Sequence, residues 1–561
     1  MTHPRSRLRR HPAAPRPAPA AGAAGARAAR LRIDRWWVPA LLAALHVGLA
    51  LLAFVPAPHP GGDNAVYLAL ARSLLAGEGY RDLYAPGAPA HVQFPPGFPA
   101  LLAAGLALGL RAWAGIKLVV VAASAAAVAL TWAWARRRGG PRAALAAAFL
   151  VAVSPGVLEL SHWELSDVPF WALTMAALLG WERLGRGRTR RLVFASLATA
   201  AAYLTRSAGL PLLGAAALWL AWRRRWKQLG LYLLATVPPA AAWWLWTRAQ
   251  RSYLEAFWSA NPYAPGGGAL TLSGVFGRIV ENLGLYLGRL FPTLLWGSAG
   301  TLFVVLGGAV AALALYGWAR HLRRPGVAEA WFPLYAGMLL LWTPQWAGER
   351  LALPLLPLVL LYAGEGVVAL ARLMRAASPR AVATAAAAVF ALACAPGLAA
   401  KVGAGSACTR AYLDGDAYAC LSAEWHDFFA MAEVARDRLP DGAVVVSRKP
   451  ALFHAESGLR GRTFPLARDP GAFFRAAEEA GARYVVLDYL DEVSTQYLTP
   501  ILIRRPRAFC VIEALGPERA VLFGIAPGAA RMPDQRADPG AAEVDVGFKP
   551  CGREYLRTEV R

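Results

Sequence analysis

Long apolar runs alternate with short basic segments along most of this 561-residue chain. A helix needs about 20 apolar residues to cross the hydrocarbon core of a bilayer, and residues 36–55 are the first clear case. Further runs of this kind, several of them shorter, predict about eleven membrane-spanning helices in all. The further runs are 116–135, 142–155, 168–182, 192–205, 208–222, 228–247, 294–318, 331–345, 350–371 and 381–399.

The basic residues lie on one side of these predicted spans. If the N-terminus is cytoplasmic, the inner segments hold 28 of the 59 Lys and Arg residues and two acidic residues, a net charge of +26. The whole chain carries +24, so the remainder is close to neutral. This is the positive-inside pattern of a membrane protein, and we expect no nucleic-acid partner. The inner segments are 1–35, 136–142, 182–191, 223–227, 319–324 and 372–380.

Three segments in the first part of the chain need separate interpretation. Residues 1–35 are rich in Ala, Pro and Arg, which predicts a disordered basic cytoplasmic tail. The apolar run that follows is long enough to span, so an uncleaved anchor is favoured over a cleaved signal peptide. The apolar run at 97–113 breaks the alternation of sides, and we expect a juxtamembrane or re-entrant helix on the outer side. The alternative is that one of the short spans is false.

Composition supports a membrane domain followed by an extracytoplasmic one. Hydrophobic residues make up 57% of the chain, charged residues 17%, and the mean hydropathy is +0.38, which excludes an ordinary soluble globular protein. Residues 36–400 are the predicted transmembrane domain. An odd number of spans places residues 401–561 outside, where the pattern predicts a small α/β domain. Its expected helices are 424–439 and 469–482, and its expected strands are 443–447, 483–488, 509–514 and 520–525.

The cysteines agree with an oxidising compartment for the C-terminal domain. Cys408, Cys420, Cys510 and Cys551 lie in it, whereas Cys394 lies in the last span. Four cysteines allow three pairings. The short loop favours Cys408 with Cys420, which leaves Cys510 with Cys551; four unpaired thiols are the alternative. Neither a CxxC nor an HExxH motif occurs, so no metal site is predicted.

The first outer loop holds a candidate catalytic carboxylate. Asp63 follows two glycines and opens an amphipathic run, a position that suits the N-terminus of a helix, where backbone N–H groups favour an anion. Tyr67 lies one turn later on the same face. Their structural alternatives are a helix cap for Asp63 and an interfacial aromatic for Tyr67.

The second outer loop and two later arginines add polar groups at the same membrane boundary. Glu159, His162, Glu164 and Asp167 crowd within nine residues, and such groups near hydrocarbon imply a cavity or a partner; a solvated loop is the alternative. Two more residues, Arg206 and Arg350, lie at outer span ends against the positive-inside trend. Guanidinium groups match phosphate geometry, and snorkelling to lipid headgroups is the alternative.

Five short segments, taken in their order along the chain, resemble segments of GT-C glycosyltransferases, and the resemblance covers roughly residues 30–400. The most similar branch is the bacterial one related to protein O-mannosyltransferases and lipid A aminoarabinose transferases, which use polyprenyl-phosphate-linked sugars. The resemblance is carried by DNAVYLALARSLLAGEGY (63–80), FPPGFPALL (94–102), ELSDVPF (164–170), LTRSAGLP (204–211) and ERLALPLLP (349–357).

The resemblance implies a polytopic α-helical membrane fold of GT-C type in the inner (cell) membrane, with a variable outer domain. It implies inverting transfer of a sugar from a polyprenyl-phosphate donor to a hydroxyl of a lipid, glycan or protein acceptor on the outer face. Asp63 matches the catalytic carboxylate, expected to act as general base. Asp167 matches the second-loop acid, and Arg350 a donor-phosphate position that Arg206 could share. The remaining candidates are Glu164, His162 and Tyr67, for acceptor binding or tuning of the base.

Some features limit how far the resemblance extends. Gln93 and Phe94 stand where some relatives have an acidic-basic pair before the double proline, so the acceptor or the hold on the donor phosphate can differ. The first loop has no DxD, which disfavours a pyrophosphate donor with a required metal; a divalent cation remains possible. A transporter or flippase is the main alternative, although no internal repeat is evident. Most acids lie at outer ends or in loops; Glu365 is the main exception, for which a helix–helix contact is the alternative, and it is given no role. A non-catalytic relative that presents the outer domain is a third possibility.

Overall fold

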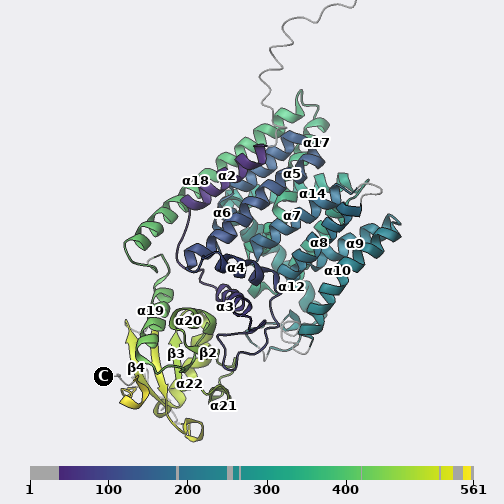
Figure 1. The fold of residues 1–561 in the computed structure, drawn as a ribbon. Coiled ribbons are helices and arrows are strands. Elements are labelled where there is room, and N and C mark those ends of the chain that lie inside the picture. The colour runs from purple at the N-terminus through teal and green to yellow at the C-terminus, as the bar shows by residue number, and fades with distance from the viewer. Residues whose placement is uncertain are drawn as a thin grey trace, which may run out of the picture.

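The computed structural model describes residues 37–184, 189–248, 257–264, 267–418, 420–516, 520–534 and 547–557. The basic tail expected at 1–35 lies outside the described residues. Two parts are evident in Figure 1: a large bundle of helices, and a smaller domain built on a sheet at one end of the bundle. We call the smaller part, residues 423–557, the sheet domain.

Each apolar run expected to span the membrane contains a helix in the bundle. Two of the runs lie within the single long element α5, which bends at Gly140. The bundle helices are α2 (Trp37–Leu52), α3 (Asp63–Leu75), α4 (Gly97–Ala107), α5 (Trp113–Val153), α6 (Pro155–Leu160), α7 (Asp167–Glu182), α8 (Thr189–Thr205), α9 (Leu210–Trp222), α10 (Trp226–Thr247), α12 (Leu272–Leu285), α13 (Phe291–Trp296), α14 (Thr301–His321), α15 (Val327–Leu341), α16 (Glu349–Ala352), α17 (Leu356–Leu373) and α18 (Pro379–Leu413).

Length and composition separate the membrane candidates from the other helices. Five helical segments in the described part of the chain are long and apolar enough to cross a membrane. They are Trp113–Val153, Trp226–Thr247, Thr301–His321, Glu349–Leu373 and Pro379–Leu413. Helix α4, within the run that broke the alternation of sides, has 11 residues and is therefore about 16 Å long. That length is about half the roughly 30 Å apolar layer of a bilayer, and the juxtamembrane position of this helix stays a prediction.

The sheet domain has five strands in the order β2-β1-β3-β5-β4. Strand β1 pairs in parallel with β2 and β3, whereas β5 is antiparallel to β3 and β4. Helices α19 and α20 cover one face, and α21 and α22 cover the other. The elements are α19 (Ala423–Arg438), β1 (Val444–Val446), α20 (Pro450–Ser457), β2 (Arg460–Arg462), α21 (Pro470–Ala480), β3 (Tyr484–Asp488), α22 (Thr499–Arg504), β4 (Phe509–Leu515) and β5 (Ala520–Ile525).

All four expected strands and both expected helices of this domain are present, and alternation along β3 explains the two layers. Val485 and Leu487 face the core under α21, whereas Tyr484 and Val486 face the core under α19, as the two-residue period of a strand requires. Strand β2 was not expected, because its sequence, Arg-Gly-Arg, is polar. Helix α18 continues to Leu413, past the expected domain boundary at residue 400. This extension packs against the residues after α2, where Gly405 lies against the Ala53 backbone and Thr409 Oγ1 donates to the Phe54 carbonyl.

Two disulfides, one before the sheet domain and one within it, have the pairing expected from the sequence. Cys408 at the end of α18 pairs with Cys420, and Cys510 on β4 pairs with Cys551 near the C-terminus. Cys394 is a buried free thiol within α18. The first bridge links the last bundle helix to the segment that leads into the sheet domain.

The sheet domain packs directly onto the first loop of the bundle. Helix α20 contacts α3, and the Gly461 N–H on β2 donates to the Tyr84 carbonyl at 2.8 Å. The Trp113 indole at the start of α5 donates to Glu456 Oε1 at 2.7 Å. These contacts hold the loop that carries Asp63 between the two parts of the molecule.

Candidate active site

Four charged side chains from four separate segments meet at the end of the bundle that carries the sheet domain. Arg350 Nη1 on α16 lies 3.8 Å from Asp63 Oδ2 and 3.9 Å from Asp167 Oδ2. Arg206 Nη1, between α8 and α9, lies 3.0 Å from the same Asp167 oxygen. We call these residues the carboxylate–arginine cluster. Positions spread over nearly 290 residues of sequence thus form one group, and all four were candidates from the sequence.

The two carboxylates of the cluster differ in exposure. The side chain of Asp63 is 43% exposed, whereas that of Asp167 is 4% exposed. The side chain of Arg350 is 27% exposed. A buried carboxylate needs paired charges, and Asp167 has both arginines beside it. Asp63 is the carboxylate that an incoming molecule can reach, while Asp167 anchors the guanidinium groups behind it.

Local sequence explains how Asp63 is presented. It is the first residue of α3, and Gly62 before it has φ 96°, a left-handed conformation that favours glycine. The Gly62 N–H donates to Asn64 Oδ1 at 3.2 Å. The partial positive charge at the helix N-terminus stabilises the ionised form of a carboxylate placed there.

Tyr67 lies one turn further along α3, inside the same site. Its hydroxyl shares a hydrogen bond of 3.1 Å with Ser166 Oγ, which also accepts from Arg206 Nη1 at 3.0 Å. Its ring packs against Phe94 of the FPPGF segment. Burial raises the pKa of Tyr67 well above its ordinary value, so the phenol stays protonated and acts as a hydrogen-bonding group rather than a base.

Glu164 belongs to a second group behind the cluster. Its Oε1 lies 3.5 Å from Lys117 Nζ, and both side chains are almost fully buried. Its Oε2 accepts from the backbone N–H of His59 at 3.2 Å, and the His59 ring stacks on Trp163 at 4.1 Å. Burial raises the pKa of Glu164, and the neighbouring Lys117 opposes that rise. This group fixes the start of the loop that leads to Asp63.

His162 occupies a third environment. It is buried, and its ring lies 5.7 Å from that of Phe54 at the end of α2. Burial, followed by the charge of Lys117, lowers the pKa of His162 to about 3, so the imidazole is neutral. The remaining acid of this loop, Glu159, pairs with Lys401 Nζ at 2.5 Å. Neither residue is part of the carboxylate–arginine cluster.

The structure adds basic residues that the sequence argument did not name. Lys117 carried a usable signal, because a lysine at the outer end of a span runs against the positive-inside trend as the two arginines do. Lys449 carried none. It precedes α20 in the sheet domain, and its Nζ donates to the Gly61 carbonyl at 3.0 Å. A Cβ added to Gly62 would lie 3.1 Å from the Lys449 side chain, so the lysine covers the turn before Asp63.

Within the described ranges, no group of three or more His, Cys, Asp or Glu side chains is placed to hold a metal ion. The carboxylate–arginine cluster has two acids, and each is beside a guanidinium.

The model of the dolichyl-phosphate-mannose-protein mannosyltransferase family matches residues 93–246. This stretch includes the FPPGF segment, Asp167 and Arg206. No curated protein matches the chain at a meaningful level.

Solved structures share the fold over most of the chain. ArnT from Cupriavidus metallidurans in the apo state matches with a TM-score of 0.55 and 14% identity, over 88% of this chain and 98% of that one. The same protein bound to undecaprenyl phosphate gives 0.54. The Archaeoglobus fulgidus oligosaccharyltransferase, in complex with Zn and sulfate, gives 0.52 and 15% identity, over 87% of this chain and 72% of that one.

These matches confirm the resemblance to the GT-C superfamily. The family match and the shared fold support a membrane glycosyltransferase, and the apolar helices agree with a membrane location.

Proposed function

We propose that this protein transfers a sugar from a polyprenyl-phosphate-linked donor to a hydroxyl group of an acceptor, on the outer face of the cell membrane and with inversion. The observation that carries the proposal is an exposed carboxylate, Asp63, 3.8 Å from the guanidinium of Arg350 in a fold shared with GT-C enzymes. Two structures with this fold were solved with undecaprenyl phosphate and dolichol phosphate, which supports a ligand of that class here.

In the proposed step, Asp63 is the general base. It accepts the proton of the acceptor hydroxyl while that oxygen attacks the anomeric carbon of the sugar. The bond between the anomeric carbon and the phosphate oxygen breaks, and its electron pair remains on the polyprenyl phosphate. Attack opposite the leaving group inverts the anomeric centre, and Asp63 then releases its proton to solvent. No covalent enzyme intermediate is required.

The arginines would stabilise the departing phosphate. Arg350 meets both carboxylates through Nη1, and the forked guanidinium has further N–H donors that can bind phosphate oxygens bidentately. Arg206 is fixed by Asp167 and Ser166. Donors that are already oriented where negative charge develops lower the barrier most. Asp167 is thus a positioning residue for the two guanidinium groups.

The proposed topology follows from the charge pattern. The N-terminus is cytoplasmic, about eleven spans follow, and the sheet domain lies outside. This arrangement puts the carboxylate–arginine cluster at the outer surface, within reach of a lipid phosphate whose prenyl tail stays in the bilayer. The acceptor would approach Asp63 from the exposed side, beneath the sheet domain.

Asp63→Asn tests the proposal in cells. Mass spectrometry of envelope glycans and lipids, with and without the gene, first identifies the product that depends on it. A general base contributes about 10²- to 10⁴-fold to a rate, so we expect D63N to lower the initial rate of product formation by about that factor at an unchanged protein level.

Glu78→Gln is the matched control, because Glu78 is an exposed acid in the same loop and the substitution removes the same charge. We expect normal product from E78Q. Product from D63N at the wild-type rate would remove Asp63 from the mechanism. Movement of a labelled lipid-linked sugar across the membrane without sugar transfer would instead favour a transporter.

A further inference from the structure

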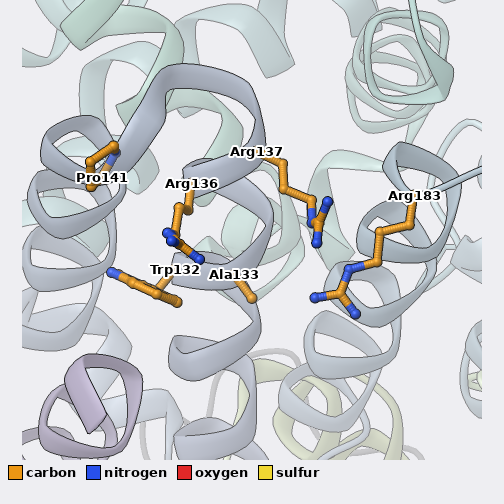
Figure 2. A pocket seen from close by; sticks show the side chains of 6 residues that line it. All are labelled: Trp132, Ala133, Arg136, Arg137, Pro141 and Arg183. Atoms are coloured by element: carbon orange, nitrogen blue, oxygen red, sulfur yellow. The ribbon is translucent and has the colours of Figure 1, made fainter. Parts of the chain in front are cut away.

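A basic pocket lies at the bend of α5, far from the carboxylate–arginine cluster. It has a volume of about 330 Å³, and its lining residues are Trp132, Ala133, Arg136, Arg137, Pro141 and Arg183. Figure 2 shows these side chains, with Arg137 from α5 and Arg183 from the end of α7 pointing toward each other. We call this cavity the kink pocket.

The bend that forms the pocket is built into the sequence. Gly140 has φ 83°, a left-handed conformation that favours glycine. Pro141 follows. It has no backbone N–H to donate, and its ring would clash with the carbonyl one turn earlier, so a straight helix cannot pass through this position. The two halves of α5 therefore fold back on each other at this point, so that Pro141 forms one wall of the cavity while Trp132 and Ala133 form another.

The kink pocket and the active site lie at opposite membrane surfaces in the proposed topology. Lys117, which pairs with Glu164 behind the active site, is 19 residues before Arg136 on the same helix. At 1.5 Å per residue this separation is about 28 Å, close to the roughly 30 Å thickness of the hydrocarbon core. The pocket is thus at the cytoplasmic surface, where the lipid headgroups begin.

Positive charge in the pocket exceeds negative charge. None of the lining residues is acidic, and the carboxylates Glu182 and Glu329 both pair with Arg138, which does not line the pocket. Among the described residues, no carboxylate lies within ion-pair distance of Arg137 or Arg183. Partial burial, and then the charges of Arg137 and Arg191, lower the pKa of Arg183, as expected for arginines that crowd one another.

The wall formed by Trp132 and Ala133 has apolar and polar groups side by side, as expected at the boundary between lipid headgroups and acyl chains. The Trp132 ring lies beneath the Arg136 guanidinium, 5.3 Å from it. The Trp132 indole N–H is buried and has no hydrogen-bond partner within the described residues. Tryptophan is enriched at membrane interfaces because it offers both an apolar ring and a polar N–H.

We propose that the kink pocket binds the phosphate of an anionic lipid headgroup in the cytoplasmic leaflet. Guanidinium groups bind phosphate oxygens through paired N–H donors, and basic pockets between membrane helices on the cytoplasmic side suit such headgroups. The cavity is larger than a phosphate group alone requires, and its apolar wall continues into a membrane-spanning helix. A lipid therefore fits it better than a soluble phosphate ion does.

The test uses purified full-length protein in detergent, with bound lipid counted by native mass spectrometry. Phosphatidylglycerol is the anionic probe, phosphatidylcholine the zwitterionic one, and inorganic phosphate the soluble competitor. Each basic residue strengthens anionic-lipid binding by about fivefold. Arg137→Gln with Arg183→Gln should therefore weaken phosphatidylglycerol binding by about 30-fold and leave phosphatidylcholine binding unchanged.

Arg323→Gln with Arg324→Gln is the matched control, because these exposed arginines lie on the same face, outside the pocket. A second variant, Ala133→Trp, fills the cavity without a change of charge and should also abolish binding of the anionic lipid. Three results would overturn the proposal: equal losses in the control variant, equal binding of the two lipids by wild-type protein, or displacement of bound lipid by millimolar inorganic phosphate. The wild-type comparisons decide the matter even if a variant fails to fold.

Discussion

Loss of Lys117 should destabilise the protein strongly, because it would leave a buried carboxylate unpaired. The Lys117 and Glu164 side chains are 2% and 1% exposed, and Nζ lies 3.5 Å from Oε1. At an effective dielectric constant of about 20, charges at that distance attract by about 5 kcal/mol. Removal of one partner from a buried pair costs about 3 to 5 kcal/mol, so we expect a loss of that size for Lys117→Met.

A double-mutant cycle gives this prediction its sharpest form. In Lys117→Met with Glu164→Gln, neither of these two positions buries a charge. The glutamine oxygen can still accept from the His59 N–H, which in the wild type donates to Glu164 Oε2 at 3.2 Å. The double variant should therefore be more stable than K117M alone. Thermal unfolding in detergent micelles measures the order of stability. Lys227→Met, at an exposed lysine of α10, is the control and should change stability by less than about 0.5 kcal/mol.

Acid provides a second check on the same pair. Burial raises the pKa of Glu164, so a Glu164 without its lysine takes up a proton more readily as the pH falls. The stability difference between wild type and K117M should therefore shrink toward low pH. If K117M and E164Q each cost under about 1 kcal/mol and their effects simply add, the argument from buried charge is wrong.

Three further predictions concern the sheet domain. Lys449→Met removes the hydrogen bond to the Gly61 carbonyl and should lower the rate of sugar transfer several-fold with the product unchanged, whereas Lys449→Arg should retain most of the rate; equal rates in both would contradict this. Burial raises the pKa of Asp488 to about 6, so the folded protein binds a proton at this carboxyl more tightly than the unfolded chain does. The stability that this bound proton contributes is lost as the pH rises through about 6. Asp488→Asn should therefore be more stable than wild type at pH 8 and equal to it near pH 4, as measured by thermal unfolding. Replacement of Cys510 and Cys551 by Ala opens a loop with a sequence separation of 41 and should cost about 4 kcal/mol by the chain-entropy relation, measured by denaturant unfolding against oxidised wild type.

The helical bundle could be predicted because its signal is repeated and local. Every apolar run of the sequence contains a helix, since each run has to satisfy its own backbone and bury its own side chains. Strand β2 could not be predicted from the sequence, because its three residues, Arg-Gly-Arg, form a strand only through pairing with β1. The bend of α5 at Gly140 could be foreseen from the Gly-Gly-Pro sequence, whereas the pocket beside it depends on where α7 ends.

Residues of the site could be predicted only where a charged side chain lies next to an apolar span on the side that is poor in basic residues. Asp63, Arg206 and Arg350 stand out because charges at the outer ends of spans are unusual, and the structure brings them together. Lys449 is 388 positions from its partner Gly61, and its sequence neighbours give no hint of that contact. The sequence argument gave the intramembrane Glu365 no role. In the structure this carboxylate pairs with His321 on another helix.

In the proposed topology, helix α18 determines how far the sheet domain lies from the bilayer surface. Its 35 residues extend about 52 Å, which exceeds the roughly 30 Å apolar layer by about 20 Å. Its upper turns are braced against the end of α2 through the hydrogen bond from Thr409 Oγ1 to the Phe54 carbonyl, and Cys408 bridges its last turns to Cys420. If the proposed function is right, the length of this helix sets the gap through which an acceptor reaches the lipid-linked sugar. Insertion of one helical turn in α18 above the membrane would raise the domain by about 5 Å and widen that gap.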